Sequence, residues 1–84
     1  MIPALDIEKE GFVFKYSEEG NHNVAYTKPH STRPLMVDVI YNDKNNWVLI
    51  CIGDEETTWA DWETVFAGQI HTQEDFVKVL SMVL

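Results

Sequence analysis

Residues 35–52 read LMVDVIYNDKNNWVLICI, and this stretch decides the fold. Its first part, 35–41, is rich in β-branched and aromatic residues, and its last part, 47–52, is apolar throughout. The polar run 42–46 between them suits a hairpin loop. A strand that is apolar on both faces is typical of the middle of a sheet. We therefore predict that 35–41 and 47–52 are adjacent central strands of an antiparallel sheet.

A second hairpin is predicted ahead of these strands. Phe12, Phe14 and Tyr16 alternate with other residues, which puts all three on one face of a predicted strand. The turn 17–21 then leads into a returning strand, since its glycine can adopt positive φ. The segment 28–34 holds two prolines, which restrict the backbone and remove ladder donors, so it is expected to be a loop.

The C-terminal segment has the pattern of a capped helix. Thr72 suits the N-cap, and Asp75 stands at the capping-box spacing after it. Phe76, Leu80 and Val83 follow at i, i+4 and i+7. Further apolar residues widen this stripe almost around the helix: Val77, Val79, Met82 and Leu84. The helix is therefore expected either to be deeply buried, which a helix lying across a sheet favours, or to pair with a second copy.

Together these elements predict the α+β class, with a four- or five-stranded antiparallel β meander and one C-terminal helix packed on one face. The fifth strand, where it forms, is expected at residues 64–66, and Gly68 is expected to end it. A chain of 84 residues suffices for one hydrophobic core, so 1–84 is expected to be a single domain.

The charge of the chain is strongly acidic and uneven. The formal net charge is -8, of which residues 1–44 carry -2 and residues 45–84 carry -6. This balance opposes direct binding of nucleic acid and of anionic membranes, and it favours either simple solubility or a partner with a basic surface. Residues 1–6 lack a signal-peptide pattern, and no apolar run approaches the roughly 20 residues that span a bilayer. We expect a cytoplasmic protein with no membrane contact.

No constellation of catalytic or cofactor-binding residues is visible. The single cysteine, Cys51, stands between two isoleucines, which predicts a buried, unreactive thiol. His22, His30 and His71 are too far apart for the short spacings of structural zinc sites. The acids lack the order of an EF-hand, and no glycine-rich phosphate loop follows a strand. The sequence therefore predicts a protein that is not an enzyme and that holds no metal or other cofactor.

The segment 54–63, DEETTWADWE, is the candidate functional region because it sets two tryptophans among carboxylates. The candidate partner-binding residues are Asp54, Glu55, Glu56, Trp59, Asp61, Trp62 and Glu63. Thr58 and Asp61 have an approximate capping-box spacing, which predicts a helical turn with both rings on one side. Either the rings fold down and seal one end of the sheet, or at least one is exposed as an interface anchor inside a carboxylate rim.

Residues 65–76, VFAGQIHTQEDF, continue to Val79 and Leu80. In this order of an aromatic, a glycine, an aliphatic, a helix cap and an apolar helix, the tail resembles a closing segment of small uncharacterised bacteriophage and prophage proteins. The resemblance covers about a quarter of the chain. It implies a phage-associated accessory protein, a class that includes acidic inhibitors of host defence, and it assigns no functional residue.

The leading hypothesis is a non-enzymatic protein-interaction domain, a phage accessory protein or inhibitor that occupies a basic surface of a host protein. Two alternatives stay open. One is a structural or assembly protein that homodimerises through the C-terminal helix. The other is a nucleic-acid mimic, although the acids gather in one segment and do not form a long stripe.

Overall fold

The computed structural model describes residues 3–84 and contains one five-stranded antiparallel sheet and a C-terminal helix. The strands lie side by side in chain order, so the sheet is a meander. They are β1 (Val13–Glu18), β2 (Asn23–Pro29), β3 (Met36–Asn42), β4 (Trp47–Gly53) and β5 (Glu63–Gln69). The helical elements are the 3-10 turns η1 (Glu8–Glu10) and η2 (Trp59–Asp61) and the helix α1 (Gln73–Val83). The predicted α+β meander with one C-terminal helix is confirmed, with five strands.

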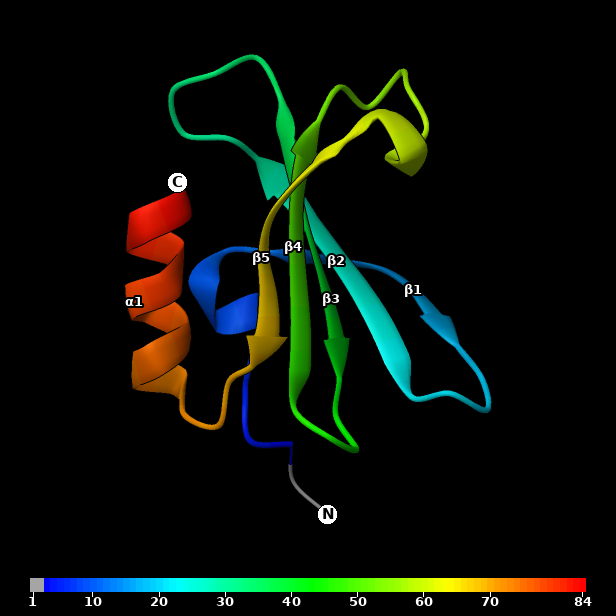
Figure 1. Cartoon of the computed structure of the whole chain (residues 1–84), viewed down its shortest axis with the longest axis vertical. Coiled ribbons are helices and arrows are strands. Elements are labelled where there is room, and N and C mark those ends of the chain that lie inside the picture. Colours follow the sequence, from blue (N-terminus) through cyan, green and yellow to red (C-terminus); the bar gives the residue numbers. More distant parts are fainter. Residues whose placement is uncertain (1–2) are drawn as a thin grey trace.

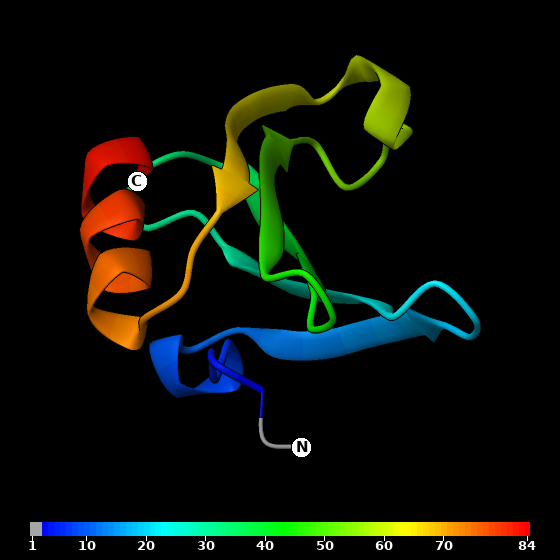
Figure 2. The same ribbon diagram turned by 60° about the horizontal axis from the view of Figure 1, so that its bottom comes forward.

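Helix α1 covers only one face of the sheet. It runs beside β5, with η1 close to it (Figure 1). The segment between β4 and β5, which carries η2, lies well away from α1 (Figure 2). The sheet therefore has a helix face, which packs against α1, and an open face on its other side.

The helix face holds the hydrophobic core. Alternate side chains of the two central strands point to it, each at most 5% exposed: Val37, Val39 and Tyr41 from β3, and Val48, Ile50 and Ile52 from β4. Phe76 and Leu80 of α1 pack against them. The two central strands are those expected from the sequence, and their pairing aligns Val39 with Ile50.

The N-terminus of α1 is capped as predicted, because the backbone N–H of Asp75 donates to Thr72 Oγ1 at 3.1 Å. The apolar stripe is used unevenly. Phe76 is fully buried, whereas Val77 and Met82 are 43% and 76% exposed. The sheet thus covers one side of the helix and leaves these two apolar side chains in solvent.

The prediction that Phe12, Phe14 and Tyr16 share one face is wrong. Phe12 precedes β1 and is buried on the helix face, 6.4 Å from the ring of Phe76. A β-bulge between Phe14 and Tyr16 then shifts the register and turns Tyr16 to the open face. Phe14 stays on the helix side, half-exposed, with its ring edge-on to Tyr26.

Several boundaries also differ from expectation. Strand β2 continues through Pro29, so the predicted loop at 28–34 starts two residues late. Strand β5 is longer than residues 64–66, and Gly68 lies inside it, paired with Val48. The predicted turn 17–21 extends to His22, which has a left-handed φ of 65°, and the expected positive φ at Gly20 is present.

The N-terminal segment is fastened to the start of α1. Leu5 and Ile7 are buried in the core. The side chain of Gln73 bridges to the backbone of Asp6, accepting from its N–H and donating to its carbonyl, each at 2.8 Å. The same Gln73 amide donates to Glu10 Oε2 at 2.8 Å. These hydrogen bonds close the core at the N-terminal end of α1. The sequence pattern does not reveal this arrangement.

The burial of Phe76 gives a stability test. Phe76→Ala should lower the free energy of unfolding by about 3–5 kcal/mol, because it removes a fully buried ring from the centre of the core. The matched control Val77→Ala, at the next and exposed position, should change it by less than about 0.5 kcal/mol. Urea unfolding followed by circular dichroism measures both. Equal losses would mean that the helix packs in a different rotation.

Candidate interaction site

A buried carboxylate lies on the open face of the central strand β3. The side chain of Asp38 is 0% exposed, and the register places it between Thr27 of β2 and Cys51 of β4. Two donors reach its Oδ2 atom, Lys15 Nζ at 2.7 Å and Trp59 Nε1 at 2.8 Å. Its Oδ1 atom has no hydrogen-bond partner among residues 3–84. A buried carboxylate is costly unless it is paired, so the Lys15 ammonium is the main compensation for this charge.

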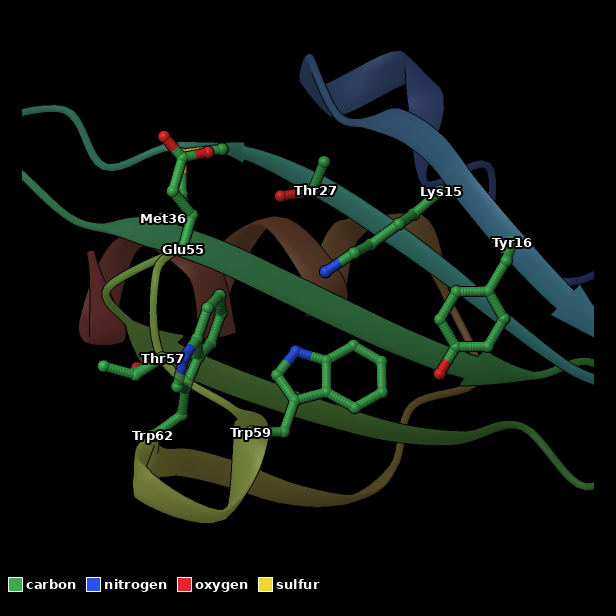
Figure 3. A pocket seen from close by; sticks show the side chains of 8 residues that line it. All are labelled: Lys15, Tyr16, Thr27, Met36, Glu55, Thr57, Trp59 and Trp62. Atoms are coloured by element: carbon green, nitrogen blue, oxygen red, sulfur yellow. Dashed lines mark hydrogen bonds between the residues drawn. The ribbon is translucent and has the colours of Figure 1, made fainter.

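The bulge in β1 brings Lys15 to this carboxylate. Phe14 pairs with Tyr26 and Tyr16 pairs with Ala25, which leaves Lys15 as the extra residue between the two pairs. Bulges re-aim side chains in this way, and here Lys15 and Tyr16 both reach the open face (Figure 3). Without the bulge, Tyr16 would point to the helix face.

Trp59 sits over the open face and is half-buried. Besides its hydrogen bond to Asp38, its ring lies 5.7 Å from that of Tyr16, with the planes tilted by 32°. Lys15 Nζ lies 4.8 Å from the centroid of the Trp59 ring, within range of a cation–π contact. The predicted helical turn forms as η2, but the Thr58 side chain makes no capping hydrogen bond, so the expected capping box is absent.

Trp62 is buried and closes the end of β4. Its ring packs flat on Gly53, where an added Cβ would lie 2.2 Å from Trp62 Cγ. The indole N–H donates to the Asp54 carbonyl at 2.9 Å and to Thr57 Oγ1 at 3.0 Å. This ring therefore has the sealing role, while Trp59 keeps an exposed part.

The two tryptophans, Tyr16 and Lys15 enclose a pocket of about 460 Å³ on the open face. Figure 3 shows Lys15 and Tyr16 entering from β1, and the tryptophans facing them from the 54–62 segment. Glu55 stands at one end of the pocket. Burial raises the pKa of Tyr16 above its usual value, with smaller contributions from the charges of Glu18 and Asp38, so its hydroxyl is neutral and can donate a hydrogen bond.

The segment 54–63 carries five carboxylates in solvent, of which Glu55 lines this pocket. Asp54, Glu55, Glu56, Asp61 and Glu63 are all exposed. The ion pairs found within residues 3–84 are Lys15–Asp38 and Lys78–Glu74, and His22 Nδ1 lies 3.5 Å from Asp43 Oδ1. No basic side chain of the described part of the chain thus neutralises the five carboxylates, although Asp54 Oδ1 accepts the backbone N–H of Glu56 at 3.0 Å.

The seven candidate partner-binding residues do not all lie at the same place in the structure. Glu55, Trp59 and Trp62 line the pocket. Asp54 and Glu56 lie with Glu55 beside a neighbouring hollow, and Asp61 and Glu63 line neither of these two pockets. Sequence reasoning missed the residues that the sheet contributes: Lys15, Tyr16, Thr27, Met36 and Asp38. Asp38 did carry a signal, because an acid in the middle of an otherwise apolar strand needs a partner.

The other reactive groups do not join this site. Cys51 is buried, as predicted, with its Sγ atom 3.8 Å from Thr64 Oγ1. Burial raises the pKa of the Cys51 thiol, the Thr64 hydrogen bond lowers it, and the Asp38 charge raises it further, so the thiolate is disfavoured. Among residues 3–84, no three His, Cys, Asp or Glu side chains gather in a way that suits a metal ion.

The chain matches no protein-family model, and neither the curated proteins nor the solved structures contain a match. Within the described residues, no helix has the length and apolar character needed to cross a membrane.

The ion pair between Lys15 and Asp38 can be tested by a double-mutant cycle. Lys15→Met should lower the free energy of unfolding by about 1–3 kcal/mol, because it leaves a buried carboxylate without its cation. In the Asp38→Asn background, Lys15→Met should lower the free energy of unfolding by at most half as much as it does in wild type. The buried group is then neutral and still accepts the hydrogen bond from Trp59. Lys78→Met, which breaks an exposed pair, should cost less than about 0.5 kcal/mol. Equal losses from Lys15→Met in both backgrounds would show that the two residues are not coupled.

The packing of Trp62 on Gly53 gives a local test. Gly53→Ala should displace the ring, break its two indole hydrogen bonds and speed hydrogen exchange at Trp62 Nε1, measured by NMR. The control Gly68→Ala places a Cβ 3.3 Å from the end of the Phe66 ring and should leave the Trp62 signal unchanged. An unaltered Trp62 signal in Gly53→Ala would contradict the packing.

Proposed function

We propose that this chain is a small non-enzymatic interaction domain that binds a basic surface of a partner protein through the 54–63 segment. The observation that carries the proposal is a turn of three exposed carboxylates, Asp54, Glu55 and Glu56, without ion pairs among the described residues, next to a pocket that holds the half-exposed Trp59. Tryptophan is enriched among residues that dominate binding energy, and rim charges steer a complementary partner.

The position of this surface supports the proposal. It lies on the open face, away from α1, so a partner can contact it without disturbing the core (Figure 2). Trp59 is already held by its hydrogen bond to Asp38, which reduces the entropy lost when a partner packs on it. The resemblance of the C-terminal tail to bacteriophage and prophage proteins suggests a phage accessory protein or inhibitor, with its partner in a bacterial host.

The alternative of a homodimer through α1 has less support. Val77 and Met82 are the helix residues that remain as large exposed apolar groups, and single exposed apolar residues are normal on monomers. Nucleic-acid mimicry is supported still less, because the five free carboxylates belong to one short segment.

The proposal is tested by charge reversal at equal net charge. Partners are captured from bacterial lysate, purified and titrated against wild-type protein and two double variants. Glu55→Lys/Glu56→Lys should weaken binding by about tenfold or more, because it reverses the charge of two exposed acids in the turn beside the pocket. Glu8→Lys/Glu19→Lys makes the same change in net charge at exposed acids outside the 54–63 segment and should weaken binding much less.

Titration across about 0.05–0.5 M salt gives a second measurement, since screening should reduce wild-type affinity and leave little further effect on the reversed variant. If both double variants lose affinity equally, the net charge and not the 54–63 segment drives binding. If neither loses affinity, the proposed surface is wrong.

A further inference from the structure

A second hollow adjoins the tryptophan pocket. It measures about 260 Å³ and lies between the acidic turn 54–56 and the loop that precedes β3. Both loops leave the same end of the sheet (Figure 1). Met36 and Glu55 line both hollows, so the two adjoin at these residues. Each is far larger than the share of one water molecule, about 30 Å³, and has room for a side chain.

The two hollows differ in chemistry. The first, called here the aromatic hollow, is walled by the rings of Tyr16, Trp59 and Trp62. The second, the acidic hollow, has three carboxylates, Asp54, Glu55 and Glu56, against the single cation of Arg33. Its remaining walls are apolar: Pro29, Pro34, Leu35 and Met36.

The position of Lys15 decides which hollow takes a cation. Its ammonium lies 4.8 Å from the Trp59 centroid and 5.7 Å from the Trp62 centroid, so the aromatic hollow already contains a positive charge against its rings. Lys15 thus already occupies the cation–π position on these rings, which leaves no such place for an external cation. An apolar or aromatic side chain would instead bury area against the rings and the Lys15 stem.

The acidic hollow suits a basic side chain. Its excess of negative charge attracts an ammonium or guanidinium, while Pro34 and Leu35 offer an apolar wall for the long methylene stem of lysine or arginine. Glu55 and Glu56 are free of ion pairs with the described residues and are thus available as acceptors. An arginine can bind a carboxylate through two parallel hydrogen bonds.

We infer that the two hollows form one groove for an extended segment of a partner protein, in which an apolar side chain fills the aromatic hollow and a nearby lysine or arginine fills the acidic hollow. An extended chain places alternate side chains on one side about 7 Å apart, which allows neighbouring hollows to be filled by one short segment. This inference rests on the proposed function and narrows it from any basic surface to a short apolar-basic peptide.

The test uses an array of blocked nonapeptides in which one tryptophan or leucine stands one to four residues from one arginine, on either side. Peptides with both residues at a preferred spacing should bind wild-type protein at least tenfold more tightly than peptides that lack either one. Binding should shift the indole N–H signal of Trp59 in NMR spectra and leave that of Trp47 in place. Trp47 is 46% exposed at the far end of β4 and is an internal control.

Two variants separate the hollows. Trp59→Ala should lose the preference for the apolar residue of the peptide, and Glu55→Gln/Glu56→Gln should lose the preference for arginine. Trp47→Ala should keep both preferences, within about twofold. Thermal unfolding of each variant checks that the fold is retained.

The outcomes distinguish this inference from the broader proposal. If no peptide of the array binds, or if binding follows arginine alone and ignores Trp59→Ala, the groove inference is wrong. If in that case a captured partner still loses affinity on Glu55→Lys/Glu56→Lys, the 54–63 segment remains a docking surface for a folded basic protein. If the peptides bind but the spectra shift at Trp47 and not at Trp59, the binding site lies elsewhere and the groove is refuted.

Discussion

One buried oxygen atom, Asp38 Oδ2, ties together three parts of the chain that are distant in sequence. It accepts from Lys15 of β1 and from Trp59 of the segment between β4 and β5, while Asp38 itself belongs to β3. An apolar residue at this position would avoid the cost of burying a charge and would often be at least as stable. It would not hold an indole N–H or an ammonium. The structural role of this carboxylate is therefore to position Trp59 and Lys15, and these two side chains define the shape of the pocket.

The two faces of the sheet have different roles: the helix face stabilises the fold, and the open face presents the groups that can contact a partner. The helix face buries Val39, Ile50 and Phe76 completely, and the N-terminal segment closes its edge through Gln73. The open face is covered only in part, by the buried ring of Trp62, which rests on a glycine, and by the half-buried ring of Trp59. Because most of the buried apolar area belongs to the helix face, the open face can present charged and aromatic groups without weakening the core.

The fold was predictable from the sequence where composition and local spacing were unambiguous. The central strands follow from their β-branched and unbroken apolar residues, and the capped helix follows from its N-cap and its i, i+4 spacing. The site was predictable only on its loop side. A β-bulge adds one residue without any change of composition, so the alternation of Phe14 and Tyr16 gave the wrong face and concealed Lys15. Likewise the burial of Trp62 depends on the missing side chain of Gly53, a contact made nine residues earlier in the chain.

The placement of Lys15 also means that apolar contact and charge attraction act at different places on this surface. Without Lys15, the tryptophan rings could attract an external cation as well as apolar groups. Its charge is neutralised inside the protein by Asp38, and its stem and ammonium occupy the side of the rings where an external cation would bind. The rings are thereby left to apolar contacts, whose strength depends on buried area and hardly on salt. The exposed carboxylates of Glu55 and Glu56 attract positive charges of a partner. This attraction has a longer range, and salt weakens it. A partner that satisfies both must offer apolar surface and positive charge as separate, adjacent groups, and the distance between the two hollows then sets the spacing at which it can do so.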